Sequence, residues 1–129
     1  MGFVSQPHAC AVDIALLKLG IFLREKKDGR AQRYIEAAAK NIEGVFFPRF
    51  WNEKEKTFQQ YARGQFDSAP NLFVPNKIAT ACEALVLLAA ATGKQTYLTK
   101  AAQAAEKIIE LQSDDALHRG GIYQSNDRE

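Results

Sequence analysis

The chain has few of the residues on which metal-based or thiol-based chemistry depends. Its 129 residues include only two cysteines and two histidines, and these do not fall at the spacing of a metal-binding motif. Cys10 and Cys82 lie in apolar helical surroundings without a CxxC spacing, which suits buried free thiols and leaves a disulfide between them open. No Gly-rich phosphate loop and no Ser/His/Asp order stands out. We therefore expect no cofactor and no metal.

Long apolar runs and dense basic runs are lacking as well. No stretch reaches the roughly 18 apolar residues that a membrane span needs. The net charge is +2, and the most basic stretch, residues 24–30, is interrupted by Glu25 and Asp28, which argues against nucleic acid. The first apolar stretch carries Asp13 and Lys18 and lacks the basic leader of a signal peptide. We expect a soluble protein, cytoplasmic if the chain is full length, with a secreted parent as the alternative.

What the chain does have is an internal repeat. Gly29 and Gly93 align at a shift of 64 residues; the second half then lacks one residue, so that the second helix of each half matches at a shift of 63. The matched pairs are Ala15/Ala79, Ile21/Leu85, Leu23/Leu87, Gln32/Gln95, Tyr34/Tyr97, Ala38/Ala101 and Glu43/Glu106. A period of this length suits two long helices plus a substantial loop.

Each half predicts one helical hairpin. We expect helices at about 8–27, 31–47, 75–92 and 96–112, with Gly29 and Gly93 as left-handed caps and Pro48 as a stop. The first and third helices are the more apolar pair and should lie inside; the inward face of the first would be Val12, Ala15, Leu16, Leu19, Phe22 and Leu23.

The segments after the second and fourth helices match in length. Residues 49–61 alternate around a polar turn like a short β-hairpin, and residues 113–125 are their counterpart. The predicted fold is all-α: one domain over 1–129, made of two consecutive antiparallel helical hairpins (8–61 and 75–125) joined by a linker at 62–74.

Several short motifs resemble those of α/α toroids that act on carbohydrate. Residues 92–98, Thr-Gly-Lys-Gln-Thr-Tyr-Leu, are similar to the inter-helix turn of six-hairpin glycosidases. Residues 76–80 and the Gln112…Gly120-Gly121-Ile-Tyr-Gln124 loop resemble the helical pectate lyases, and Phe50-Trp51-Asn52 is similar to an element of glucoamylase-like toroids. The resemblance covers most of residues 8–125 and implies two hairpins of a toroid. The chain would then be a fragment, or a small protein that completes its ring by self-association.

A polar stripe on the third helix is the first candidate site. Asn76, Thr80 and Glu83 fall at i, i+4 and i+7, and in a toroid they would face the central cavity. A partly desolvated Glu83 would have a raised pKa and could act as a general acid. The competing interpretation is structural: the hydroxyl of Thr80 would form a hydrogen bond with the backbone of its own helix, and Glu83 would point into solvent. Gln6, Cys10 and Asp13 form a weaker equivalent on the first helix.

The loops hold the remaining candidates. Asp115 follows Asp114 in the Gly-Gly loop and could pair with a second carboxylate in acid/base catalysis, although adjacent aspartates after a helix are usually a solvated turn. The residues that could bind substrate are flat rings for stacking on sugars, basic groups for acidic sugars and the polar Asn76 of the third-helix stripe: Arg49, Trp51, Tyr61, Asn76, His118, Arg119 and Tyr123. The aromatic residues among them could instead pack against the ends of their own hairpins and have no ligand.

We therefore expect a carbohydrate-processing protein whose parent cleaves glycosidic bonds, by hydrolysis or by β-elimination, with an oligo- or polysaccharide as its partner. The alternative is a non-catalytic helical-repeat scaffold that binds other proteins. Two hairpins alone would leave parts of Phe22, Ile78, Ala79 and Val86 uncovered, so we also expect a homo-oligomer.

Overall fold

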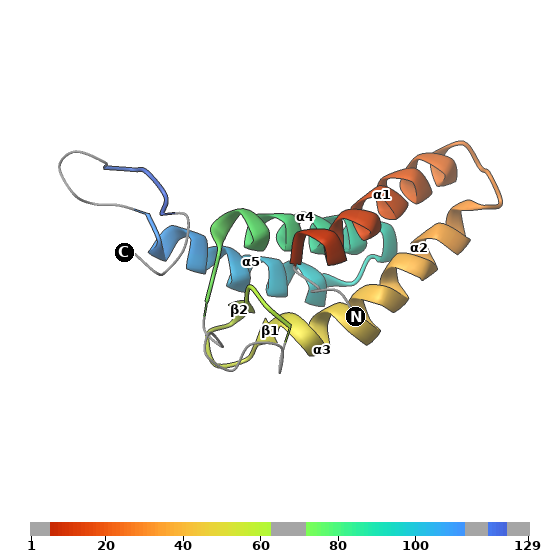
Figure 1. Cartoon of the computed structure of the whole chain (residues 1–129). Coiled ribbons are helices and arrows are strands. Elements are labelled where there is room, and N and C mark those ends of the chain that lie inside the picture. The colour runs from red at the N-terminus through yellow and green to blue at the C-terminus, as the bar shows by residue number, and fades with distance from the viewer. Residues whose placement is uncertain (1–5, 63–71, 113–118, 124–129) are drawn as a thin grey trace.

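The computed structural model describes residues 6–62, 72–112 and 119–123 of the chain. The protein is mainly α-helical (Figure 1). Its elements are α1 (Gln6–Glu25), α2 (Ala31–Asn41), the π-helix η1 (Ile42–Phe46), α3 (Phe47–Phe50), β1 (Trp51–Asn52), β2 (Thr57–Phe58), α4 (Pro75–Thr92) and α5 (Gln95–Glu110). No described helix is both long and apolar enough to cross a bilayer.

The helices pack as two antiparallel pairs. In the first pair, Gly20 of α1 lies against Ile35 of α2, and Asp13 accepts a hydrogen bond of 2.8 Å from Asn41. The contacts run in opposite directions along the two helices, as an antiparallel hairpin requires. In the second pair, α4 turns at Gly93 and packs along α5.

The two pairs meet through α1 and α4, which lie side by side and run the same way. At their C-terminal ends, Arg24 donates a hydrogen bond of 2.6 Å to the carbonyl oxygen of Ala91. Further back, the ammonium of Lys18 lies 3.0 Å from a carboxylate oxygen of Glu83. Figure 1 shows α1 and α4 above α2 and α5.

The core is centred on aromatic rings at the junction of the two pairs. Phe46, Phe50 and Phe58 are fully buried, and the centroid of the Phe46 ring lies 5.0 Å from those of the other two. Burying a large aromatic side chain contributes on the order of 2–3 kcal/mol. The short β1–β2 hairpin, which pairs Trp51 with Phe58, is therefore anchored in the core by its side chains.

Local signals predicted several elements correctly. The helix expected at 75–92 is α4, and Gly93 adopts the left-handed conformation with φ of 75°. The β-hairpin expected within 49–61 forms as β1 and β2.

Two expected helix ends are wrong. Pro48 does not stop the second helix, which continues through η1 and one further turn to Phe50. Pro48 lies in the first turn of α3, directly after the π-helical turn of η1, where the hydrogen-bond pattern of the helix changes and proline is accommodated. At the end of α1 the left-handed residue is Lys27, with φ of 55°, and not Gly29.

The inward face expected for the first helix is also wrong. Val12, Leu19 and Phe22 are exposed. The buried face consists instead of Cys10, Asp13, Leu17 and Gly20. The helix is apolar nearly all round, so hydrophobicity does not select a face. The buried face is set instead by Gly20, which has no side chain. Only glycine leaves room there for Ile35 of α2 to approach closely.

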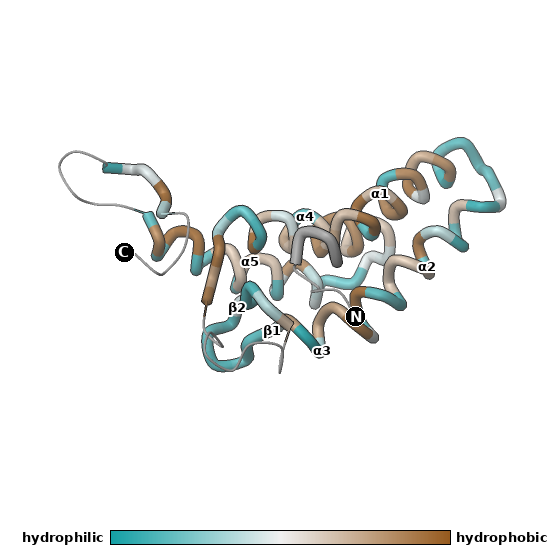
Figure 2. Tube along the Cα trace, viewed as in Figure 1, coloured by the Kyte–Doolittle hydropathy of each residue, from teal (hydrophilic) through white to brown (hydrophobic). Residues whose placement is uncertain are grey.

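Figure 2 shows where polar residues gather: the turn between α1 and α2 and the turn of the β-hairpin are hydrophilic. At the first of these turns, Asp28 accepts hydrogen bonds from the backbone and side chain of Arg30. These bonds lower the pKa of Asp28 to about 2.

Candidate functional site

A groove of about 620 Å³ lies at the N-terminal end of α4. Its walls come from the start of α4, the C-terminal half of α5 and the segment around residue 122. The lining residues are Val74, Pro75, Asn76, Ala79, Ile108, Ile122 and Tyr123. The groove is thus mainly apolar, with one amide and one phenol, which is the composition of a site that binds a ring and orients it by a few polar contacts.

Backbone pairing brings Tyr123 to this groove. Gln112 and Ile122 form an antiparallel bridge, and the backbone N–H of Tyr123 donates a hydrogen bond of 2.9 Å to the carbonyl of Leu111. The side chain of Gln112 also donates to the carbonyl of Gly120, at 3.0 Å. Gly120 has φ of 88°, which glycine adopts without strain. Residues 119–123 therefore lie against the C-terminal end of α5, next to the start of α4.

Asn76 reaches the same groove because α4 begins at Pro75. Val74 is extended and Pro75 occupies the first helical turn, where proline is favoured. Asn76 follows on the exposed side of the helix. Two of the residues predicted from sequence for sugar binding, Asn76 and Tyr123, thus line one groove.

The rest of the predicted stripe on α4 behaves as a solvated helix face. The hydroxyl of Thr80 donates a hydrogen bond of 2.9 Å to the carbonyl of Asn76, one turn earlier. The side chain of Glu83 is half exposed and pairs with Lys18 at 3.0 Å. Glu83 is not among the residues that line the groove.

Trp51 is part of the core and is not an open platform. Only 7% of its surface is exposed, and its ring lies 5.0 Å from that of Phe58 and 5.7 Å from that of Phe47. The ammonium of Lys100 lies 4.5 Å from its centroid, in a cation–π contact. A sugar has no face of this ring on which to stack.

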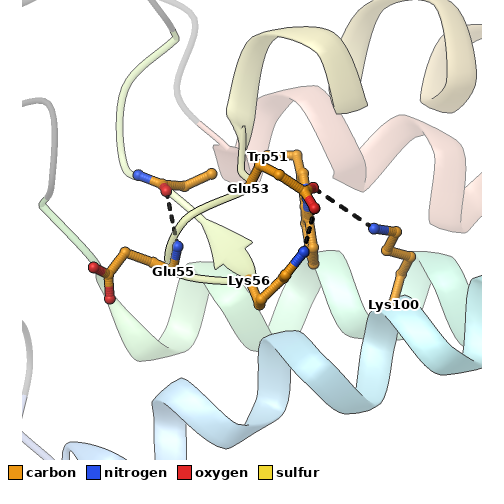
Figure 3. Close-up of polar contacts among 6 residues, drawn as sticks. Trp51, Glu53, Glu55, Lys56 and Lys100 are labelled. Atoms are coloured by element: carbon orange, nitrogen blue, oxygen red, sulfur yellow. Dashed lines mark hydrogen bonds and ion pairs between the residues drawn. The ribbon is translucent and has the colours of Figure 1, made fainter.

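Figure 3 shows how the turn of the β-hairpin is tied to Trp51 and α5. The indole N–H of Trp51 donates a hydrogen bond of 2.7 Å to Glu53, which also pairs with Lys56 and lies 3.9 Å from Lys100. The hydrogen bonds from Lys56 and Trp51 hold the pKa of Glu53 below its usual value. These contacts hold the turn of the hairpin against Trp51 and α5 and therefore have a structural role.

Lys107 of α5 makes a second set of charged contacts. The ammonium of Lys107 pairs with Glu55 at 2.9 Å and with Glu110 at 2.7 Å, and lies 5.3 Å from the centroid of the Phe73 ring. Partial burial disfavours the charged form of Lys107, but the hydrogen bonds with Glu110 and Glu55 outweigh it and raise its pKa.

The other predicted residues are not brought to the groove. Arg49 is exposed on α3, Arg119 is exposed in the segment before the Gln112–Ile122 bridge, and Tyr61 is half-buried after β2. Asp115 and His118 lie outside the described residues. Among the described residues, no cluster of three or more potential metal ligands occurs.

Two members of the weaker stripe on α1, Cys10 and Asp13, lie in the interior, and the side chain of Gln6 lies outside the described part of the chain. Asp13 is buried, with one carboxylate oxygen bonded to Asn41 and the other without a partner. Burial raises its pKa to about 6. Burial also raises the pKa of Cys10, which neighbours it, and brings that of Cys82 to about 11. Both cysteines are free and stay in the thiol form at neutral pH.

Sequence reasoning missed the walls of the groove. Val74, Ile108 and Ile122 carry no signal other than being apolar, and they come from three separate segments. Only the packing of α4 on α5 brings them together.

No family model, no curated protein and no solved structure matches this chain.

Proposed function

We propose that the chain is a carbohydrate-processing α/α-toroid protein, or a part of one, and that it binds an oligo- or polysaccharide in the groove at the start of α4. The observation that carries the proposal is the meeting of Asn76 and Tyr123 in one groove. Each was selected from sequence for the chemistry of sugar binding, and they lie 47 residues apart in the chain.

The groove has the parts that a sugar ring requires. The ring of Tyr123 offers a flat apolar face for the C–H face of a pyranose, and the amide of Asn76 can both donate to and accept from hydroxyl groups. Pro75, Ala79 and Ile108 supply an apolar floor. A site with so few polar contacts predicts a dissociation constant on the order of 0.1–1 mM.

Cleavage of a glycosidic bond, by hydrolysis or β-elimination, is our proposal for the parent protein. It would use Glu83 and Asp115 as the acid/base pair. In the parent protein, Arg49 and Arg119 would bind the carboxylates of an acidic sugar at positions outside this groove, because neither of them lines it.

The test is titration with a panel of neutral and uronate-containing oligosaccharides, followed by calorimetry and by NMR shifts. We expect Tyr123→Ala to weaken binding by about fivefold or more, in line with about 1 kcal/mol for an aromatic stacking contact. Tyr123→Phe keeps the ring and should keep most of the affinity. Tyr34→Ala, a half-buried tyrosine on α2 that does not line the groove, is the matched control. If no glycan binds, or if Tyr123→Ala binds as well as the unmodified protein, the proposal is wrong.

A second candidate is a non-catalytic helical-repeat scaffold that binds other proteins. The observation that favours it is the exposure of large apolar residues on α1 and α4: Val12, Leu19, Phe22 and Val86. Contiguous apolar surface of this kind usually marks an interface. Protein binding in the absence of glycan binding would favour this candidate.

A further inference from the structure

A second cleft, of about 250 Å³, lies where η1 and α3 face the first turns of α5. It is lined by Glu43 and Phe47 on one side and by Thr96, Tyr97 and Lys100 on the other. The groove at the start of α4 borders the C-terminal half of α5, so the two sites are at opposite ends of that helix. Sites for drug-sized ligands have volumes of about 300–1,000 Å³, so this smaller cleft fits a ligand the size of an amino acid.

Two aromatic rings form the apolar part of the cleft. Tyr97 is buried, with 7% of its surface exposed. Phe47 is half-buried, and the centroid of its ring lies 5.7 Å from that of Trp51 and 5.4 Å from that of Phe58. Because the surrounding core holds both rings in place, the cleft offers a fixed apolar surface to the side chain of a ligand.

The cleft also has one carboxylate and one ammonium, and both are loosely paired. Glu43 lies 3.8 Å from Lys94, and Lys100 lies 3.9 Å from Glu53 (Figure 3). These distances are longer than a charged hydrogen bond. The other ion pairs among the described residues have distances of 3.0 Å or less. Glu43 and Lys100 therefore keep the capacity to form short hydrogen bonds with a ligand.

Lys94 shows that an ammonium is attracted to the edge of this cleft. Its ammonium lies 3.8 Å from the carboxylate of Glu43 and 6.0 Å from the centroid of the Tyr97 ring, and both groups attract a cation. The side chain of Lys94 is 63% exposed, so it can move into solvent when the ammonium of a ligand takes its place. Glu43 belongs to the π-helix η1, and π-helical turns are frequent at functional sites.

We propose that this cleft binds a small zwitterion with an apolar side chain, of the kind that a free aromatic or aliphatic amino acid represents. The ammonium of the ligand pairs with Glu43, and its carboxylate pairs with Lys100 and the exposed hydroxyl of Thr96. Its side chain packs on the rings of Phe47 and Tyr97. A ligand with a single charge leaves one of the two charged groups without a partner. This inference does not depend on sugar binding in the groove.

The experiment titrates the whole chain with L-phenylalanine, followed by calorimetry and by NMR shifts of the backbone amides. We expect a dissociation constant on the order of 0.1–1 mM, with shifts at the residues that line the cleft. Three analogues each lack one part of the ligand. Phenethylamine lacks the carboxylate and 3-phenylpropionate lacks the ammonium, so each should bind at least about fivefold more weakly. Glycine lacks the side chain and should bind at least about tenfold more weakly.

Two variants test each charged group against the analogue that does not use it. Glu43→Gln should weaken phenylalanine at least about fivefold and leave 3-phenylpropionate unchanged. Lys100→Gln should weaken phenylalanine to a similar extent and leave phenethylamine unchanged. A variant that had lost its fold would bind none of the ligands, so these crossed effects separate pairing from folding. Glu106→Gln alters an exposed glutamate of α5 that does not line the cleft and is the matched control.

Lys94→Gln removes the competing ammonium and should not weaken phenylalanine. Four results would overturn the proposal. Phenylalanine does not bind at about 10 mM; an analogue with a single charge binds as tightly as phenylalanine; the amide shifts fall in the groove at the start of α4 and not in the cleft; or Glu43→Gln weakens phenylalanine no more than Glu106→Gln does.

Discussion

Replacing Asp13 with asparagine should stabilise the protein at neutral pH and change its stability in acid much less. Asp13 is buried, one oxygen accepts a hydrogen bond of 2.8 Å from Asn41, and the other oxygen has no partner. Burial raises its pKa from 3.8 to about 6. The folded protein therefore holds a proton that the unfolded chain releases.

The sign and size follow from this difference. The neutral carboxyl contributes its full stability below pH 3.8, and this contribution is lost as the pH rises through about 6. At about 1.36 kcal/mol per pKa unit, the loss amounts to about 3 kcal/mol. Asparagine has the same shape and no charge at any pH, so the Asp13→Asn variant should not lose this stability.

The assay is urea unfolding, followed by circular dichroism, of the unmodified protein and Asp13→Asn between pH 4 and pH 8. Relative to the unmodified protein, the free energy of unfolding of the variant should rise by about 2.4 kcal/mol from pH 4 to pH 8, because part of the full 3 kcal/mol is already lost at pH 4. Asp28→Asn is the control: the pKa of Asp28 is lowered to about 2, so its stabilisation is lost only below pH 4, and the difference between this variant and the unmodified protein should stay nearly constant between pH 4 and pH 8. A constant difference between Asp13→Asn and the unmodified protein across the pH range would refute the reasoning.

Three further changes test other parts of the structure by urea unfolding. Trp51→Ala should cost about 3–5 kcal/mol and Trp51→Phe much less, because the ring is part of the core; a neutral Trp51→Ala would contradict this. In a double-mutant cycle, Lys107→Met and Glu55→Gln should show coupling of about 0.5–1 kcal/mol across their 2.9 Å ion pair, whereas additive effects would show that the pair contributes nothing. Gly20→Ala should destabilise the protein by about 1–3 kcal/mol, since the added Cβ would lie 2.7 Å from an atom of Ile35. Gly44→Ala is the control, because a Cβ at Gly44 meets open space. Equal effects of the two substitutions would contradict the close packing of Gly20 on Ile35.

The parts of the fold that were predictable are those set by local signals. α4 begins and ends as expected because proline favours the first turn of a helix and glycine the left-handed cap, whatever surrounds them. The β-hairpin likewise follows from alternation around a polar turn. The buried face of α1 was not predictable, because a helix that is apolar on most sides can bury any of several faces. The π-helical turn at Ile42–Phe46 has no sequence signature that we can identify.

The same distinction applies to the candidate site. Asn76 and Tyr123 were found because their chemistry and their place in the repeat suggested binding. Trp51 was chosen for the same chemistry, but its burial depends on Phe58 and on Lys100, which is 49 positions away in the chain. An aromatic residue in a loop motif can equally stack on a ligand or pack into the core. Only its tertiary neighbours determine which of these two roles it has.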